Sequence, residues 1–150
     1  MTELEPQQLQ QVLHREIPLS RAMGVTVQAC CSEGVVLHAP LGPNLNHQQN
    51  AFGGSLTTLA LLAGYGVVWS LLERHAVPAE LVIHESAARF LRPVTRDFTA
   101  RCQAPEPAEV ERFVATLRRG RRARLRLTST IHEDGALAVA FEGAYAALPD

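Results

Sequence analysis

No charged side chain occurs between residues 34 and 72, and the second half of this stretch is strongly apolar. Apolar residues recur there at helical spacing, and further large apolar residues fill the opposite side. The first set is Leu56, Leu59, Ala60, Ala63, Val67 and Leu71, and the second is Leu62, Val68, Trp69 and Leu72. Because a helix that is apolar on nearly all faces is buried, the pattern predicts a long core helix. It begins at Gly53 and stops before Pro78.

The length of this apolar run is also close to what a lipid bilayer requires. Ser55, Thr57, Thr58, Tyr65 and several glycines interrupt it, and strand patterns flank both of its ends. We therefore predict a core helix here rather than a membrane span.

Alternating apolar and polar residues predict six strands around this helix, over 25–29, 35–39, 81–91, 97–104, 123–131 and 137–145. Turn signals at 32–34 and at Asp134-Gly135 make most neighbours hairpin-linked, so the sheet should be largely antiparallel. A short helix over 5–16, ended by Pro18, should cover the core without entering it, and another should run from Pro107 to Gly120. The pattern predicts one α+β domain over residues 1–150, whose helix needs a second subunit or other elements to cover its remaining faces.

Composition narrows the function classes. A net charge of −1 over 150 residues gives no case for nucleic acid or an anionic membrane as partner. Lysine is absent, which excludes a lysine Schiff base. The cysteines, Cys30, Cys31 and Cys102, show neither a CxxC nor a zinc-site spacing, so we expect no metal and a reducing cytoplasm. The polar, acidic N-terminus MTELEPQQLQ is unlike a signal peptide.

Two motifs carry a resemblance to a known family. The loop NLNHQQNAFGGSL (residues 44–56) is similar to the segment that enters the central helix of hotdog-fold acyl thioesterases. Together with FLRPV (residues 90–94), it resembles most closely the C-terminal thioesterase-like domain of YiiD-type acetyltransferases. The resemblance covers essentially the whole chain, and the acetyltransferase part is absent. It implies an antiparallel sheet wrapped around the helix and pairing of subunits into dimers.

Thioester hydrolysis needs a group that stabilises negative charge on the carbonyl oxygen, and backbone amides at a helix start supply one. The resemblance assigns this role to Gly53 and Gly54, which otherwise only permit a tight turn. It also implies that Asn46 holds water or substrate, although asparagine at that place is equally a turn former or a helix-entry cap. His47 is a candidate for proton transfer near neutral pH, or a loop histidine bonded to backbone.

The sequence departs from many hotdog thioesterases at two positions. Leu61 stands where related enzymes carry a helical Asp, and Phe52 stands where they often carry His. The carboxylate mechanism therefore does not carry over. Glu85, within an apolar strand pattern, is the candidate base from elsewhere, because burial would raise its pKa. Its alternative role is an ion pair with Arg89 or with an arginine of a neighbouring strand.

Four residues are candidate substrate contacts. Phe52 and Ser55 lie at the predicted helix start, and Arg122 and Arg124 belong to the one arginine cluster, 118–126. Arginines suit the phosphates of coenzyme A or the acidic face of an acyl carrier protein. A solvated edge strand that blocks pairing explains the cluster equally well.

The function expected from these residues is hydrolysis of acyl-CoA or acyl-carrier-protein thioesters by a cytoplasmic homodimer or dimer of dimers. No separate cofactor is implied, since coenzyme A or phosphopantetheine is part of the substrate. The missing helical carboxylate keeps open a module that binds acyl thioesters without cleaving them. A third possibility is an assembly domain whose arginines dock a partner protein.

Overall fold

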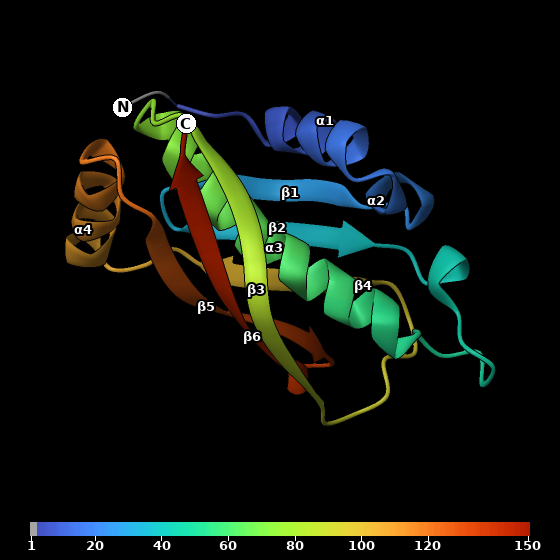
Figure 1. Ribbon diagram of the computed structural model, residues 1–150. Coiled ribbons are helices and arrows are strands. Elements are labelled where there is room, and N and C mark those ends of the chain that lie inside the picture. The colour runs from blue at the N-terminus through green and yellow to red at the C-terminus, as the bar shows by residue number, and fades with distance from the viewer. Residues whose placement is uncertain (1–2) are drawn as a thin grey trace.

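A six-stranded antiparallel sheet curves around one long helix in the computed structural model, which describes residues 3–150 (Figure 1). Residues 1 and 2, the start of the acidic N-terminal segment, lie outside the described residues. The helices are α1 (Pro6–Glu16), α2 (Pro18–Ala22), the 3-10 turn η1 (Gly42–Asn44), α3 (Gly53–Arg74) and α4 (Pro107–Arg118). The strands are β1 (Thr26–Cys31), β2 (Gly34–Ala39), β3 (Ala79–Phe90), β4 (Phe98–Gln103), β5 (Ala123–Glu133) and β6 (Ala136–Pro149).

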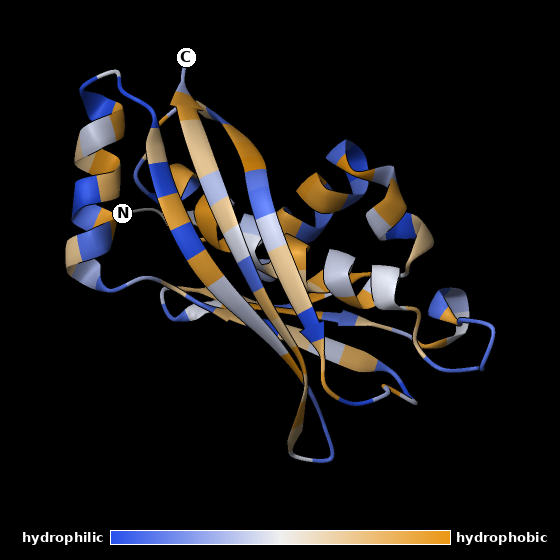
Figure 2. Ribbon diagram, turned by 60° about the horizontal axis from the view of Figure 1, so that its bottom comes forward, coloured by the Kyte–Doolittle hydropathy of each residue, from blue (hydrophilic) through white to orange (hydrophobic). Residues whose placement is uncertain are grey.

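The strands lie in the order β1-β2-β4-β5-β6-β3, and each pairs antiparallel with its neighbours. Hydrophobic and hydrophilic residues alternate along them (Figure 2). On β5, for example, the side chains of Leu125, Leu127 and Ile131 are buried while Arg124 and Arg126 are exposed. Asp134 and Gly135 both have positive φ (53° and 77°), as a two-residue hairpin turn requires. The predicted α+β class and antiparallel sheet are confirmed.

The apolar segment forms α3, which lies against the concave side of the sheet (Figure 1). It is long and apolar enough to cross a bilayer, but about two thirds of its most apolar stretch is buried inside the fold. Burial by protein is what a core helix needs, and the Tyr145 hydroxyl of β6 donates a hydrogen bond to the Leu61 carbonyl oxygen of this helix (2.7 Å). The prediction of a core helix is confirmed.

The N-terminal helix α1 enters the core, so the expectation that it only covers the core was wrong. Leu9 and Leu13 are fully buried. The reason lies on α3, where a Cβ at Gly66 would come within 2.8 Å of the Leu9 Cδ2 atom. The glycine leaves a groove into which Leu9 fits. Pro18, moreover, does not simply end α1, because it also begins the short helix α2.

One face of α3 keeps partial exposure. Leu61, Tyr65 and Trp69 recur every four residues and are only partly buried, so they lie on one side of the helix. Strand β3 pairs with β6 on one edge and, among the described residues, with no strand on the other. Among residues 3–150, this helix face is incompletely covered and this edge of β3 has no partner strand.

Candidate functional site

The start of α3 carries a group of unused hydrogen-bond donors. Phe52 precedes the helix in extended conformation (φ −66°, ψ 133°), and no side chain caps the helix. The first helical hydrogen bond runs from the Leu56 amide to the Phe52 carbonyl oxygen (3.0 Å). Within residues 3–150, the amides of Gly53, Gly54 and Ser55 therefore donate to no acceptor. With no acidic residue in the first turn, these donors and the helix dipole favour an oxyanion here.

Two cavities flank this helix start. The first, here called the loop cavity, has a volume of about 370 Å³ and includes Gly53, with Phe90 and Leu91 opposite. Its polar side chains are Asn46, Gln48, Asn50 and Arg92. The second, here called the α2 cavity, has a volume of about 320 Å³ and lies between α2, η1 and α3. Its lining includes Gly54, Ser55 and the apolar residues Leu19, Ala22, Met23, Pro43 and Phe52.

Two aromatic rings stand over the two glycines. A Cβ on Gly54 would collide with the ring of Phe52, and a Cβ on Gly53 would lie 3.5 Å from the ring of Phe90. Both rings are about half exposed, with 55% of Phe52 and 54% of Phe90 accessible to solvent. Large exposed aromatic side chains beside free amides are typical of a binding site rather than of a core.

Asn46 shapes the loop that enters the helix. Its Oδ1 atom accepts hydrogen bonds from the amides of Gln48 (2.8 Å) and Asn50 (3.1 Å), while its own amide donates to the Asn50 carbonyl oxygen (2.7 Å). The residue is therefore a turn former, as one of the two sequence interpretations had it. Its Nδ2 group has no acceptor among the described residues, and Asn46 lines the loop cavity. Asn46 is thus positioned for contact with a ligand as well.

His47 lies beside the site but not in it. Its side chain is exposed, makes no hydrogen bond within residues 3–150, and is absent from the lining of both cavities. It nevertheless follows Asn46 directly on the same loop. His47 is the histidine nearest in sequence to Gly53, and the loop would have to turn it inward for proton transfer.

Glu85 does not belong to this site, and the expectation that it is buried was wrong. Its side chain is 68% exposed and lies 3.9 Å from the Arg126 guanidinium. Arg126 projects from the outer face of β5, so Glu85 faces away from α3. On this outer face Arg126 of β5 and Glu142 of β6 are exposed as well, so water reaches the side chains that point away from α3. Of the alternatives, the ion pair with a neighbouring arginine is what the structure contains.

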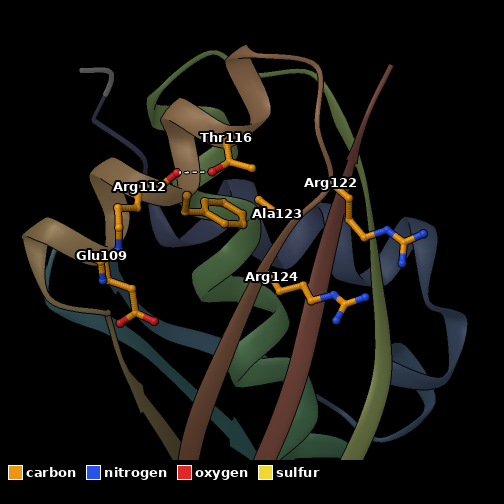
Figure 3. Close-up of a pocket in the computed structure, with 7 residues that line it drawn as sticks. Glu109, Arg112, Thr116, Arg122, Ala123 and Arg124 are labelled. Atoms are coloured by element: carbon orange, nitrogen blue, oxygen red, sulfur yellow. Dashed lines mark hydrogen bonds between the residues drawn. The ribbon is translucent and has the colours of Figure 1, made fainter.

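Arg122 and Arg124 lie at the opposite end of α3 from Gly53. With Glu109 and Arg112 they line a third cavity of about 560 Å³ between α4 and β5. The side chains of Arg122 and Arg124 extend away from α4 (Figure 3). Arg118 of α4 donates a hydrogen bond to the carbonyl oxygen of His75, which follows α3 (3.0 Å). A helix of 22 residues is about 33 Å long. One chain therefore does not bring these arginines to its own glycine pair.

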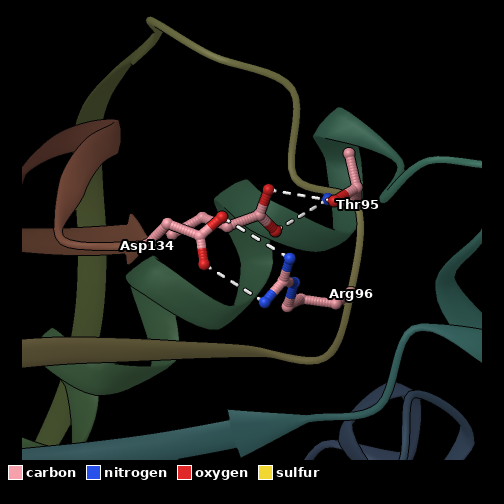
Figure 4. A network of polar contacts seen from close by, with 4 residues as sticks. Thr95, Arg96 and Asp134 are labelled. Atoms are coloured by element: carbon pink, nitrogen blue, oxygen red, sulfur yellow. Dashed lines mark hydrogen bonds and ion pairs between the residues drawn. The ribbon is translucent and has the colours of Figure 1, made fainter.

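The wall of the loop cavity is anchored to the β5–β6 hairpin (Figure 4). The backbone amide and hydroxyl of Thr95 donate to the Glu133 carboxylate (2.8 and 3.0 Å), and Arg96 pairs with Asp134 (3.1 Å). The Val94 carbonyl oxygen, in turn, accepts a hydrogen bond from the amide of Ala51 (2.8 Å). The FLRPV motif and the helix-entry loop thus hold each other in place at the cavity.

Asn44 is a structural residue of this site that the sequence pattern did not indicate. This residue is 2% exposed, and its Nδ2 group donates to the carbonyl oxygens of Met23 (2.9 Å) and Pro40 (2.7 Å). Its own carbonyl oxygen accepts from the Phe52 amide (2.7 Å). Asn44 therefore ties α2, η1 and the start of α3 together. Nothing in the sequence separates it from Asn46 and Asn50, because all three stand in the same uncharged loop.

The cysteines do not supply a nucleophile to this site. Cys30 and Cys102 are buried and all three are free thiols. Burial raises the pKa of Cys102 to about 11, so its thiol stays protonated at neutral pH. Across residues 3–150, no group of three or more His, Cys, Asp or Glu side chains is placed to hold a metal ion.

An antiparallel sheet wrapped around an apolar helix, with free amides at the helix start between two cavities, defines a thioesterase-like protein of the hotdog fold. Comparison with known families agrees, because the family described as "Putative thioesterase (yiiD_Cterm)" matches residues 6–149. The chain belongs to this family. The predicted resemblance and the predicted hotdog fold are thereby confirmed.

Solved structures share this fold. A "putative thioesterase" from Shewanella oneidensis is 30% identical, with a TM-score of 0.88 over 96% of this chain and 97% of that one. A protein of unknown function from Chlorobaculum tepidum is also 30% identical, with a TM-score of 0.93 over 97% and 94%. A protein of unknown function from Pseudomonas aeruginosa, 19% identical, shares the fold, with a TM-score of 0.84 over 99% of both chains.

Proposed function

We propose that this protein hydrolyses acyl thioesters of coenzyme A or of an acyl carrier protein, and does so in a reducing cytoplasm where its free cysteines stay reduced. The observation that carries the proposal is the uncapped start of α3, whose three free amides lie between two cavities. Membership of the thioesterase-like family supports it. Coenzyme A or phosphopantetheine enters as part of the substrate, and neither nucleic acid nor a membrane takes part.

In the proposed reaction, the thioester carbonyl oxygen accepts hydrogen bonds from the Gly53 and Gly54 amides. These donors stabilise the negative charge that develops when water adds to the acyl carbon. The free Nδ2 group of Asn46 orients substrate or water, and His47 turns inward to take the proton from the attacking water. The C–S bond then breaks, and the proton passes to the departing thiolate. The products are a carboxylic acid and a free thiol.

Release of free thiol from a panel of acyl-CoAs and acyl carrier proteins tests this function. We expect turnover by the wild type and a fall in kcat of about 10²-fold or more in His47→Ala, the worth of a general base. Glu85→Gln is the matched control and should stay within about twofold, because Glu85 is exposed and faces away from α3. Absence of thiol release from every substrate would exclude the hydrolase. Normal turnover in His47→Ala would remove His47 from the mechanism.

A second candidate function is binding without cleavage. It is favoured by one observation, namely that no carboxylate lines the loop cavity or the α2 cavity among the described residues. Calorimetry would then show acyl-CoA bound at the site, and the bound thioester would be recovered intact after hours. Turnover in the thiol-release assay would decide against this candidate.

We also propose that the chain works as a homodimer. The free edge of β3, and Leu61, Tyr65 and Trp69 on the helix α3 that contacts this strand, are features that a second copy would cover. Sedimentation equilibrium should give a mass of twice 16.4 kDa, or a multiple of that dimer. Trp69→Arg should return the mass to 16.4 kDa, because it places a charge on this helix face. A monomeric wild type would contradict the proposal.

A further inference from the structure

The ring of Phe52 lies against Gly54 at the start of α3, in the wall of the α2 cavity. Gly54 and Ser55 line this α2 cavity, whereas Gly53 lines the loop cavity. The free amides thus lie at the boundary between two spaces. A thioester held by these amides would extend one of its ends into each space.

The two spaces differ in chemistry. The loop cavity carries three side-chain amides and a guanidinium, which suit a chain with its own amide groups, such as the pantetheine arm of coenzyme A or of a carrier protein. The α2 cavity has no charged side chain among its described lining residues, and most of its wall is apolar. Hydrocarbon gains free energy on entering such a wall, whereas a polar arm would lose hydrogen bonds with water.

The wall of the α2 cavity is fixed by the hydrogen bonds of a buried residue. Asn44 lies in its wall and joins Met23, Pro40 and the Phe52 backbone through the hydrogen bonds described above. The Oδ1 atom of Asn44 is buried and has no hydrogen-bond partner within residues 3–150. A buried polar group without a partner is costly and calls for an explanation. Because the hydrogen bonds of Asn44 fix α2, η1 and the start of α3 relative to one another, the space beside Phe52 is a preformed feature of the fold.

Building on the proposed thioesterase activity, we propose that the α2 cavity receives the acyl chain while the loop cavity receives the pantetheine arm. Phe52 is then a specificity-determining residue that directs the two ends of the substrate. A methylene group is similar in size to a water molecule, about 30 Å³. The volume of about 320 Å³ thus has room for a straight chain of about ten carbons. The substrate class is a short- to medium-chain linear acyl thioester.

Filling the α2 cavity tests this assignment. Ala22 is exposed and lines it, so Ala22→Trp places an indole in the acyl path. In the wild type, kcat/KM should rise by up to about fourfold per added methylene from butyryl to decanoyl thioesters. This factor corresponds to the free energy gained when one methylene group is buried. In Ala22→Trp, decanoyl turnover should fall by about 100-fold, while acetyl turnover stays within about threefold. Ala108→Trp, on an exposed alanine of α4 outside both cavities, is the matched control and should change neither.

A variant of the loop cavity should affect all chain lengths equally. Leu91→Trp, which narrows the loop cavity, should raise KM by a similar factor for all chain lengths. If Leu91→Trp shortens the preferred chain, or Ala22→Trp affects all lengths equally or none, the assignment is overturned. If the wild type releases no thiol, the proposed hydrolysis is rejected, but the assignment of the two cavities is still tested by binding. The non-hydrolysable thioether decyl-CoA would then still have to bind the wild type at least tenfold more tightly than Ala22→Trp, by calorimetry, for the assignment to stand.

Discussion

Replacing Gly53 with proline should lower kcat for thioester hydrolysis by about 10²- to 10³-fold while the protein stays folded. Gly53 is the first residue of α3, where proline fits the helix and only removes an amide that has no partner within residues 3–150. Phe52 already has the extended conformation that a residue before proline requires (φ −66°, ψ 133°). The substitution therefore deletes one oxyanion donor with little other change, and steady-state thiol release measures the effect.

Gly53→Ala is the matched control for this variant. It keeps the amide and adds only a Cβ, which would lie at an ordinary contact distance of 3.5 Å from the Phe90 ring. We expect kcat of the alanine variant within about threefold of the wild type, and thermal unfolding of both variants close to it. Equal losses in the two variants would show that bulk beside Phe90, rather than the amide, limits the reaction, and would contradict the proposed role of the helix start.

The largest loss of stability should come from Gly34→Ala, at the first residue of β2. Gly34 has a φ of +146°, which side chains rarely adopt, and an added Cβ would collide with the carbonyl oxygen of Cys102 on β4. That oxygen belongs to the backbone of the neighbouring strand and cannot move without disturbing the sheet. We expect the free energy of unfolding to fall by about 3–5 kcal/mol, from backbone strain and overpacking together.

Urea denaturation measures this loss directly, and Tm should fall by roughly 6–20 °C. Gly42→Ala is the control, since Gly42 has no atom within 4 Å of an added Cβ and no positive φ. It should change the free energy of unfolding by less than about 1 kcal/mol. A Gly34→Ala protein as stable as the wild type would mean that β2 and β4 do not approach each other in the register described.

The candidate site illustrates how far local sequence patterns reach. The loop that precedes Gly53 and the role of amides at the helix start were predictable, because a helix start is a local feature. That no side chain among the described residues caps it is visible only in the structure. The position of Glu85 was not predictable. An acidic residue in an apolar strand is read as buried, but Glu85 lies on the outer face of the sheet near Arg126, and which face is covered depends on contacts between distant segments.

The same limit applies to Asn44, Arg122 and Arg124. Asn44 looks like any other loop asparagine until the carbonyl oxygens of Met23 and Pro40 meet at its side chain. The two arginines look like phosphate ligands until β5 places them at the far end of α3. The bond from Asn44 to Met23 and the bond from Arg118 to His75 both join residues far apart in the sequence, and no short window contains that information.

By itself, the sequence determined the core helix, the alternating strands, the hairpin turns and the loop motif at Gly53, because each follows from periodicity and turn chemistry over a few neighbouring residues. Only the tertiary structure decided which strand lies at the edge, that Leu9 enters the core, and that two cavities flank the helix start. The physical reason is that burial and cavity shape arise from side chains that meet only when the sheet closes around α3.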